Sequence, residues 1–399
     1  MSMHALRVLP RPSPVWLILV WTAAFGLASV SAAPQQAQNP RNLVPVSDET
    51  GLISQGWAAL AAGDAVTAIE RANAVLGRNT QSVGALALLV EASIASRGAT
   101  AGLSTYESWL GTRKLEEPYM IRRIALASLR EAMTSKDSRV RLGALKALVR
   151  EGDAEARAKV MDAIAQSQLP ETRVMAELGD ASSVQAIVKK MESTTVGSKR
   201  YYIEALASSG SRAAEPALAK MLDDPDPELK GAVIDALGKI GAKDMIERIR
   251  PFVQDGQSAL VRWPAARALA LMGDAAAVPF LQEMLHTELS DMLQIDAAEV
   301  LSSLGPNPDW INTARRLTGS ADPQVRRKAA KIIAPYDQSL ANEVLQALLL
   351  DPNAGIRGYA AETLASQVAA DFLTLRRLLR HDDVYVQVLA AGRIAELTR

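Results

Sequence analysis

The sequence contains no cysteine, and only three of its 399 residues are histidine. Disulfides, thiolate zinc sites and thiol nucleophiles are therefore excluded. His286 and His381 stand three repeat units apart in the array that fills the second part of the chain, too far to share a metal ion. No Gly-x-Ser-x-Gly motif is present. We therefore predict no catalytic residue, no metal site and no cofactor, and a protein that is not an enzyme.

Aromatic residues are also scarce, at 4%, whereas 49% of the residues are hydrophobic, with alanine and leucine throughout. This composition favours helices that pack closely on each other over sandwiches and barrels. No run of alternating β-branched residues indicates a sheet, so we expect an all-α fold. The 44 basic residues balance 44 acidic ones. A neutral chain has no global attraction to nucleic acid or anionic lipid.

The N-terminus has the pattern of a secretory signal peptide. Arg7 and Arg11 form a positive segment, Val15–Val30 is apolar and uncharged, and small residues suited to cleavage follow. We predict a signal peptide over 1–32 and an exported protein, periplasmic or secreted. The alternative is an uncleaved segment that anchors the protein in the inner membrane, although the apolar stretch falls short of a comfortable span. A flexible linker is expected over 33–47.

One helical pattern recurs along the second part of the chain. In Glu228–Gly241 the apolar residues follow the spacing of one helix face, and a second apolar helix pattern comes directly after it. A helix pair cannot bury its apolar stripe alone, so we expect an α-solenoid of eight stacked pairs and a closing half over 138–399. Its first helices share one apolar column at intervals of 27 to 32 residues: Leu148, Met175, Leu206, Leu237, Leu269, Leu301, Ile333, Leu364 and Ile394.

Residues that end and begin helices recur with the same spacing. A glycine four positions after the column is expected to end each first helix in the left-handed conformation. These glycines are Gly152, Gly179, Gly210, Gly241, Gly273 and Gly305. The Asp or Ser next to the glycine is placed to cap the second helix. These caps are Asp153, Asp180, Ser211 and Asp274.

The repeats resemble HEAT repeats of the short bacterial type, related to those named after phycobilisome lyases. The resemblance rests on DPDPELKGAVIDALGKIGAKDMIERIRPFV and DPQVRRKAAKII. The Val-Arg step of that family is carried by Val140 with Arg141, Val261 with Arg262, and Val325 with Arg326. The resemblance implies a right-handed superhelix of helix pairs. It also implies that the second helices line a concave face that binds partners.

A different period precedes the array. Residues 48–113 read as two helical hairpins with equivalent positions 34 residues apart, and GWAALAAGDAVTAIERANAVL resembles a tetratricopeptide repeat. Trp57 and Leu60 match that motif, whereas Ala61 and Asp64 stand where its Gly and Tyr are usual. A generic pair of helical hairpins remains the alternative. A connecting helix is expected within 114–137.

Two groups of conspicuous side chains receive structural interpretations. Trp263 and Trp310 flank repeat helices, and we expect them to be core or seam residues and not a platform for a ligand. Arg326, Arg327 and Lys328 lie on a first helix, which we expect to face outward with its charges solvated.

The resemblance and the lack of catalytic motifs together predict a non-catalytic protein–protein scaffold or adaptor in the bacterial cell envelope. Its partner, a protein or a peptide, would bind along the concave face of the second helices. A lyase-like or enzyme-accessory HEAT-repeat protein and a structural envelope spacer without a dedicated partner remain as alternatives. The predicted partner-binding residues are polar positions on second helices: Lys189, Lys190, Glu247, Arg250, Gln282, Arg315, Arg316, Arg376, Arg377 and Arg380.

Overall fold

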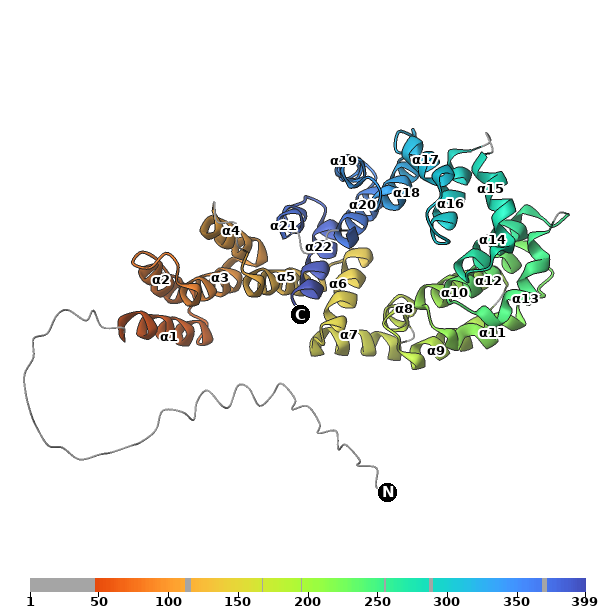
Figure 1. The fold of residues 1–399 in the computed structure, drawn as a ribbon. Helices are drawn as coiled ribbons and strands as arrows, with labels where there is room; N and C mark the ends of the chain where they lie inside the picture. Colours follow the sequence, from red (N-terminus) through yellow and green to blue (C-terminus); the bar gives the residue numbers. More distant parts are fainter. Residues whose placement is uncertain are drawn as a thin grey trace, which may run out of the picture. The chain divides into compact units, whose positions relative to one another are not determined.

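A computed structural model describes residues 47–111, 116–166, 168–194, 196–254, 256–286, 290–367 and 372–399. These residues form helices joined by turns, and no strand occurs among them (Figure 1). The prediction of an all-α solenoid is confirmed. The predicted signal peptide and all but the last residue of the predicted linker lie outside the described residues. Within the ranges given above, no helix is long and apolar enough to cross a bilayer.

Glu49–Arg399 forms one compact unit. Its first part consists of two helical hairpins and a fifth helix, and their resemblance to tetratricopeptide repeats stays a prediction. These helices are α1 (Ser47–Ala61), α2 (Ala65–Leu76), α3 (Val83–Arg97), α4 (Ala99–Leu110) and α5 (Pro118–Ala132).

The rest of the unit is an array of helix pairs. The first helices are α6 (Ser138–Arg150), α8 (Leu169–Glu177), α10 (Val196–Ser209), α12 (Pro227–Lys239), α14 (Ala259–Leu271), α16 (Asp291–Ser302), α18 (Pro323–Ile333), α20 (Ala354–Gln367) and α22 (Val384–Leu397). The second helices are α7 (Ala154–Ala165), α9 (Ala181–Glu192), α11 (Glu215–Lys220), α13 (Ile246–Ile249), α15 (Val278–His286), α17 (Pro308–Leu317), α19 (Gln338–Leu348) and α21 (Phe372–Leu379). Short 3-10 turns precede α11, α13 and α15, and another follows α13.

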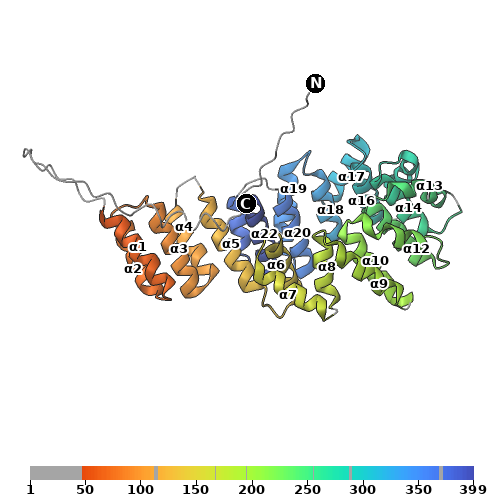
Figure 2. The ribbon, with the colours of Figure 1, turned by 90° about the horizontal axis from the view of Figure 1, so that it is seen from below.

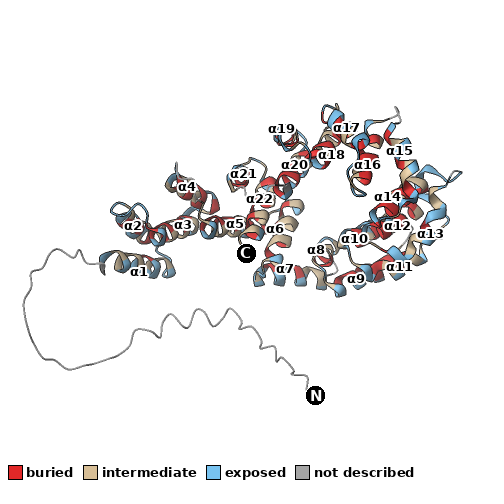
Figure 3. Cartoon of the chain, in the orientation of Figure 1, coloured by how far each residue is buried: buried red, intermediate tan, exposed pale blue. Residues whose placement is uncertain are grey.

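The predicted apolar column forms the core of this array. All nine column residues are buried, and Leu237 is 0% exposed. Figure 3 shows buried positions continuing from one helix pair to the next. The predicted glycines adopt positive φ angles, for example 80° at Gly152 and 68° at Gly241. The predicted caps also form, since the Asp153 and Asp180 carboxylates each accept a hydrogen bond from the first turn of the following helix.

In α6, α18 and α20 an arginine that follows Val or Ile ties the first helix to the turn before it. The Arg326 guanidinium donates to the carbonyl oxygens of Ser320 and Ala321, at 2.8 and 2.9 Å. Arg141 and Arg357 make the equivalent bond to the carbonyl six residues earlier. Carbonyls of a turn that leads into a helix lack helical partners, so these bonds satisfy groups that would otherwise depend on water.

The first helices, and not the second, form the inner layer of the array (Figure 1). Consecutive first helices such as α10, α12 and α14 pack directly on one another. Small residues allow this close packing, because a Cβ added to Gly238 would lie 2.5 Å from the Ala268 Cα. In a curved array the inner layer has the smaller radius, so its helices must lie closer together than those of the outer layer. The expectation that second helices line the concave face is therefore wrong, as is the expectation that the first helix bearing Lys328 faces outward.

The array closes on itself. α22 packs against α6, as one first helix packs on the next, and it also packs along α5 (Figures 1 and 2). Ile121 and Ile124 of α5 and Ile394 of α22 belong to one buried apolar cluster. α5 thus covers α22 much as a second helix covers its first. Terminal repeats of a solenoid expose an apolar side unless they are capped, and here the two ends of the array cap each other.

Candidate partner-binding surfaces

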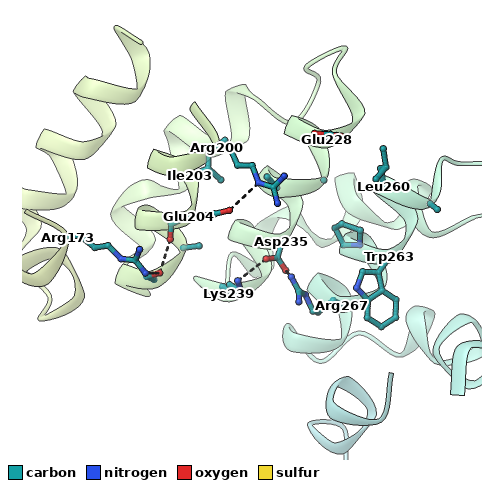
Figure 4. A pocket seen from close by; sticks show the side chains of 16 residues that line it. Arg173, Arg200, Ile203, Glu204, Glu228, Asp235, Lys239, Leu260, Trp263 and Arg267 are labelled. Carbon is teal, nitrogen blue, oxygen red and sulfur yellow. Dashed lines mark hydrogen bonds and ion pairs between the residues drawn. The ribbon is translucent and has the colours of Figure 1, made fainter. Parts of the chain in front are cut away.

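The inner face, meaning the side of the first helices turned away from the second helices, contains a cavity of about 590 Å³. α8, α10, α12 and α14 supply all of its walls, and no second helix contributes (Figure 4). Its lining combines charged side chains with a few apolar ones. These residues are Arg173, Arg200, Ile203, Glu204, Ala207, Ser208, Glu228, Gly231, Ala232, Asp235, Lys239, Ala259, Leu260, Trp263, Pro264 and Arg267.

Glycine shapes the floor of this cavity. Gly231 on α12 lies so near the Leu260 carbonyl of α14 that a Cβ would overlap that oxygen. α12 and α14 therefore pack backbone to backbone at this point, and the small residues Gly231 and Ala232 leave the space above them unfilled. Helical glycine costs about 1 kcal/mol of stability relative to alanine. That cost is accepted here because a larger residue would prevent the close approach of α12 and α14 and would fill the cavity.

Two apolar side chains of α14 border the cavity. Leu260 is 51% exposed, and Trp263 is half-buried, with its ring centroid 6.4 Å from that of Phe280. The expected core role is confirmed for Trp310, which is buried and donates from Nε1 to the Gly305 carbonyl at 3.0 Å. Trp263 differs, because one part of its side chain packs on the seam and another part is available to a ligand (Figure 4).

Most of the charges around the cavity are paired within the chain. Asp235 lies 3.0 Å from the Lys239 ammonium and also pairs with Arg267 of the next first helix. Arg173 pairs with Glu177 at 2.8 Å. These contacts hold the cavity walls in place. The Arg200–Glu204 pair, at 3.2 Å, is exposed on both sides, so it contributes little stability and can exchange partners readily.

The predicted partner-binding residues lie on the outer layer, because they were placed on second helices. Several are already engaged with neighbouring carboxylates. Arg250 pairs with Glu247 at 2.7 Å and with Asp274 at 2.8 Å. Arg315 lies 3.7 Å from Asp337, and Arg316 lies 3.9 Å from Asp291. Two of these four partners, Asp274 and Asp337, come from an adjacent repeat, so the sequence positions alone gave no sign of those pairs.

Two other predicted residues belong to the closure of the array. Arg376 is buried and contacts Glu107 at 3.2 Å and Glu116 at 2.8 Å. Arg380 donates from Nε to Glu107 at 2.6 Å. Both guanidinium groups therefore bind the N-terminal hairpins of the same chain, which makes them structural in this conformation.

The remaining predicted residues line cavities beside the second helices, and first helices also contribute to two of these cavities. Lys189 and Lys190 border a cavity of about 410 Å³, Arg377 borders one of about 440 Å³, and Gln282 borders one of about 320 Å³. Sequence reasoning missed the inner cavity, although the pair Gly231 and Gly238 was a local sign of close helix approach there. Among the residues described, no group of three or more His, Asp or Glu side chains could hold a metal ion.

The fold and the repeats together define the class of protein. A family model described as HEAT repeats matches residues 184–270 and 215–302. This chain is therefore an all-α protein that carries HEAT repeats, as its sequence pattern predicts.

A curated relative from Picosynechococcus sp. is phycocyanobilin lyase subunit alpha. It is 28% identical over 141 residues, which cover 32% of this chain and 52% of the relative. The match thus spans about half the length of that protein. Among solved structures, the complex of CpcE and CpcF of phycocyanin lyase from Nostoc sp. is 16% identical, with a TM-score of 0.38, and the match covers 71% of this chain and 95% of that one. Human deoxyhypusine hydroxylase in complex with glycerol is 17% identical, with a TM-score of 0.30, and the match covers 58% and 91%.

Proposed function

We propose that this protein is a non-catalytic scaffold that binds a segment of a partner protein in its inner cavity. The observation that carries this proposal is an exposed leucine and a half-buried tryptophan side by side on α14, at the edge of a cavity of about 590 Å³. Sites that bind ligands usually combine apolar walls with a few polar groups, and volumes of roughly 300–1,000 Å³ are typical. The inner cavity has both properties.

Binding would proceed by insertion of an apolar side chain of the partner against Leu260 and Trp263. Arg200 and Glu204 are exposed and weakly paired, so each can turn from the other toward an opposite charge of the partner. The walls need no rearrangement, since the Asp235 pairs already fix α12 to α14. A preformed site lowers the entropy that association loses through ordering.

The test compares two exposed leucines on opposite layers. Leu260→Glu places a charge at the inner cavity, and Leu350→Glu places the same charge on the outer layer, where Leu350 is 83% exposed. Crosslinking in cells, affinity purification and quantitative mass spectrometry would compare both variants with the wild type. A protein captured by the wild type and by Leu350→Glu, and lost from Leu260→Glu, supports the scaffold. Equal recovery from all three overturns the inner cavity as the binding site and favours a structural spacer.

The site of action is proposed to be the bacterial cell envelope. The support is the charged and apolar pattern of residues 1–32, together with a cysteine content of zero. The test is N-terminal sequencing of the protein recovered from the periplasm or the medium. A mature chain that begins at Ala33 agrees with export, whereas an intact N-terminus in the cytoplasmic fraction contradicts it.

A second candidate function is an accessory role to a lyase. The match to phycocyanobilin lyase subunit alpha over 141 residues favours it. In that role the inner cavity would hold a pigment or the protein that carries one. Titration of the purified protein with phycocyanobilin distinguishes the two candidates. A stoichiometric change in visible absorption that is lost in Leu260→Glu supports the accessory role, and an unchanged spectrum counts against it.

A further inference from the structure

A cavity between first and second helices combines an apolar interior with unpaired positive charge. It lies between α7, α8, α9 and α10 and has a volume of about 410 Å³. Ile187 is fully buried and faces this space, and Ile164, Leu169 and Tyr202 are partly buried around it. Lys189 and Lys190 stand at its edge, and both are exposed.

The two lysines have no partner for their ammonium groups among the residues that the structure describes. They lie in the last turn of α9, where a positive charge complements the helix dipole. That role explains why a cation is tolerated there. It does not explain two adjacent lysines beside an apolar cavity, since Lys220 alone occupies the last turn of the following second helix.

Other cations of the second helices can be compared with Lys189 and Lys190 by whether they have an ion-pair partner. Arg250, Arg315 and Arg316 line no outer cavity, and each is paired with a carboxylate of the same chain. Arg377 borders the outer cavity of about 440 Å³, and it has no partner in the described part of the chain. Lys189, Lys190 and Arg377, which border these outer cavities, are thus unpaired in the described chain, as is Lys220, which borders none of them.

We propose that the Lys189–Lys190 cavity is a docking site for an acidic segment of a partner protein. The segment inserts one large apolar side chain against the partly exposed Leu169 and Tyr202. Carboxylates on either side of that side chain pair with the two ammonium groups. Charge complementarity selects an acidic partner here even though the whole chain is neutral. The cavity is separate from the one on the inner face, so both can be occupied at once, as an adaptor requires.

The test measures the binding of short peptides to the full chain by fluorescence anisotropy. The probe is a labelled hexapeptide, EDLFDE, and two controls are EDGSDE, without apolar residues, and KRLFRK, with reversed charge. The variant K189Q/K190Q removes both charges at exposed positions, so the fold should persist. The matched control is K220Q, because Lys220 occupies the same turn of the next second helix and borders none of the cavities described.

We expect EDLFDE to bind the wild type and K220Q equally, and K189Q/K190Q about tenfold more weakly. EDGSDE and KRLFRK should bind more weakly than EDLFDE to the wild type. The proposal is overturned if EDLFDE does not bind, or if its affinity is the same for K189Q/K190Q as for K220Q. Leu260→Glu should leave the affinity for EDLFDE unchanged, which separates this site from the inner cavity.

Discussion

The Arg376 guanidinium lies 2.8 Å from the Glu116 carboxylate, although 260 residues separate them in the chain. The Tyr106 hydroxyl donates to the same carboxylate at 2.9 Å and accepts from the backbone N–H of Glu117. Burial raises the pKa of Tyr106, so this hydroxyl keeps its proton and remains a donor. The network joins the end of the repeat array to the N-terminal hairpins.

Replacing Arg376 should therefore destabilise the whole unit. Arg376→Met leaves Glu116 without its buried counter-charge and leaves Glu107 with Arg380 alone. Breaking a buried pair in this way costs about 3 kcal/mol. Thermal unfolding followed by circular dichroism measures the effect. Arg377→Met is the control, since Arg377 is the exposed neighbour without a partner in the described residues. Equal melting temperatures for the two variants would show that Arg376 does not hold the closure.

The buried column gives a second prediction. Leu237→Asp places a carboxylate at a position with 0% exposure in the middle of the array. We expect a loss of about 4 kcal/mol or more in the free energy of unfolding, because no partner for the charge is present. Leu350→Asp makes the same change at an exposed leucine and should alter stability by less than about 0.5 kcal/mol. A melting curve of Leu237→Asp that matches the wild type would contradict the assigned core.

Two helical glycines predict opposite signs for the same substitution to alanine. Gly238→Ala brings a Cβ to 2.5 Å from the Ala268 Cα, so α12 and α14 must move apart and stability should fall. Gly51→Ala in α1 meets no atom within 4 Å. It should therefore gain up to about 1 kcal/mol from helix propensity. Chemical denaturation measures both free energies, and a stabilising Gly238→Ala would refute the close approach of the two helices.

The closure should also weaken in acid. Burial raises the pKa of Glu151, but the Arg399 and Arg122 side chains outweigh it and hold the pKa below the ordinary 4.5. Burial likewise raises the pKa of Asp383. The backbone N–H of Tyr385 and the side chains of Arg357 and Arg139 outweigh this effect and hold that pKa below 3.8. Lowered pKa values stabilise the fold fully above the unfolded values, and the stabilisation is lost as the pH falls through the folded ones.

We expect the melting temperature to decline below about pH 4.5 as these two carboxylates take up protons. Arg399→Gln removes one partner of Glu151 at the closure. The melting temperature of this variant should therefore fall less steeply than that of the wild type between roughly pH 5 and pH 3. Melting curves at a series of pH values test this. A decline of the same steepness in the variant would mean that Glu151 does not link the closure to pH.

The sequence by itself determined the helix pairs, their turns and their buried column. Each of these features depends on residues a few positions apart: the spacing of Leu237 and its neighbours, the glycine that ends a first helix, and the Asp that caps the second. Local backbone geometry determines such features whatever the tertiary arrangement of the chain, so they can be predicted from the sequence without a structure.

Only the tertiary structure decided which layer faces inward and that the array closes. The layer order follows from how near Gly238 lets one helix come to Ala268, a contact between successive pairs. Closure follows from small rotations that add up over all pairs until α22 meets α5 and α6. The tertiary structure also decided which charged side chains form ion pairs, because Arg376 can contact Glu107 and Glu116 only when the two ends of the array meet. Lys189 and Lys190, by contrast, are left facing a cavity without a partner in the described chain.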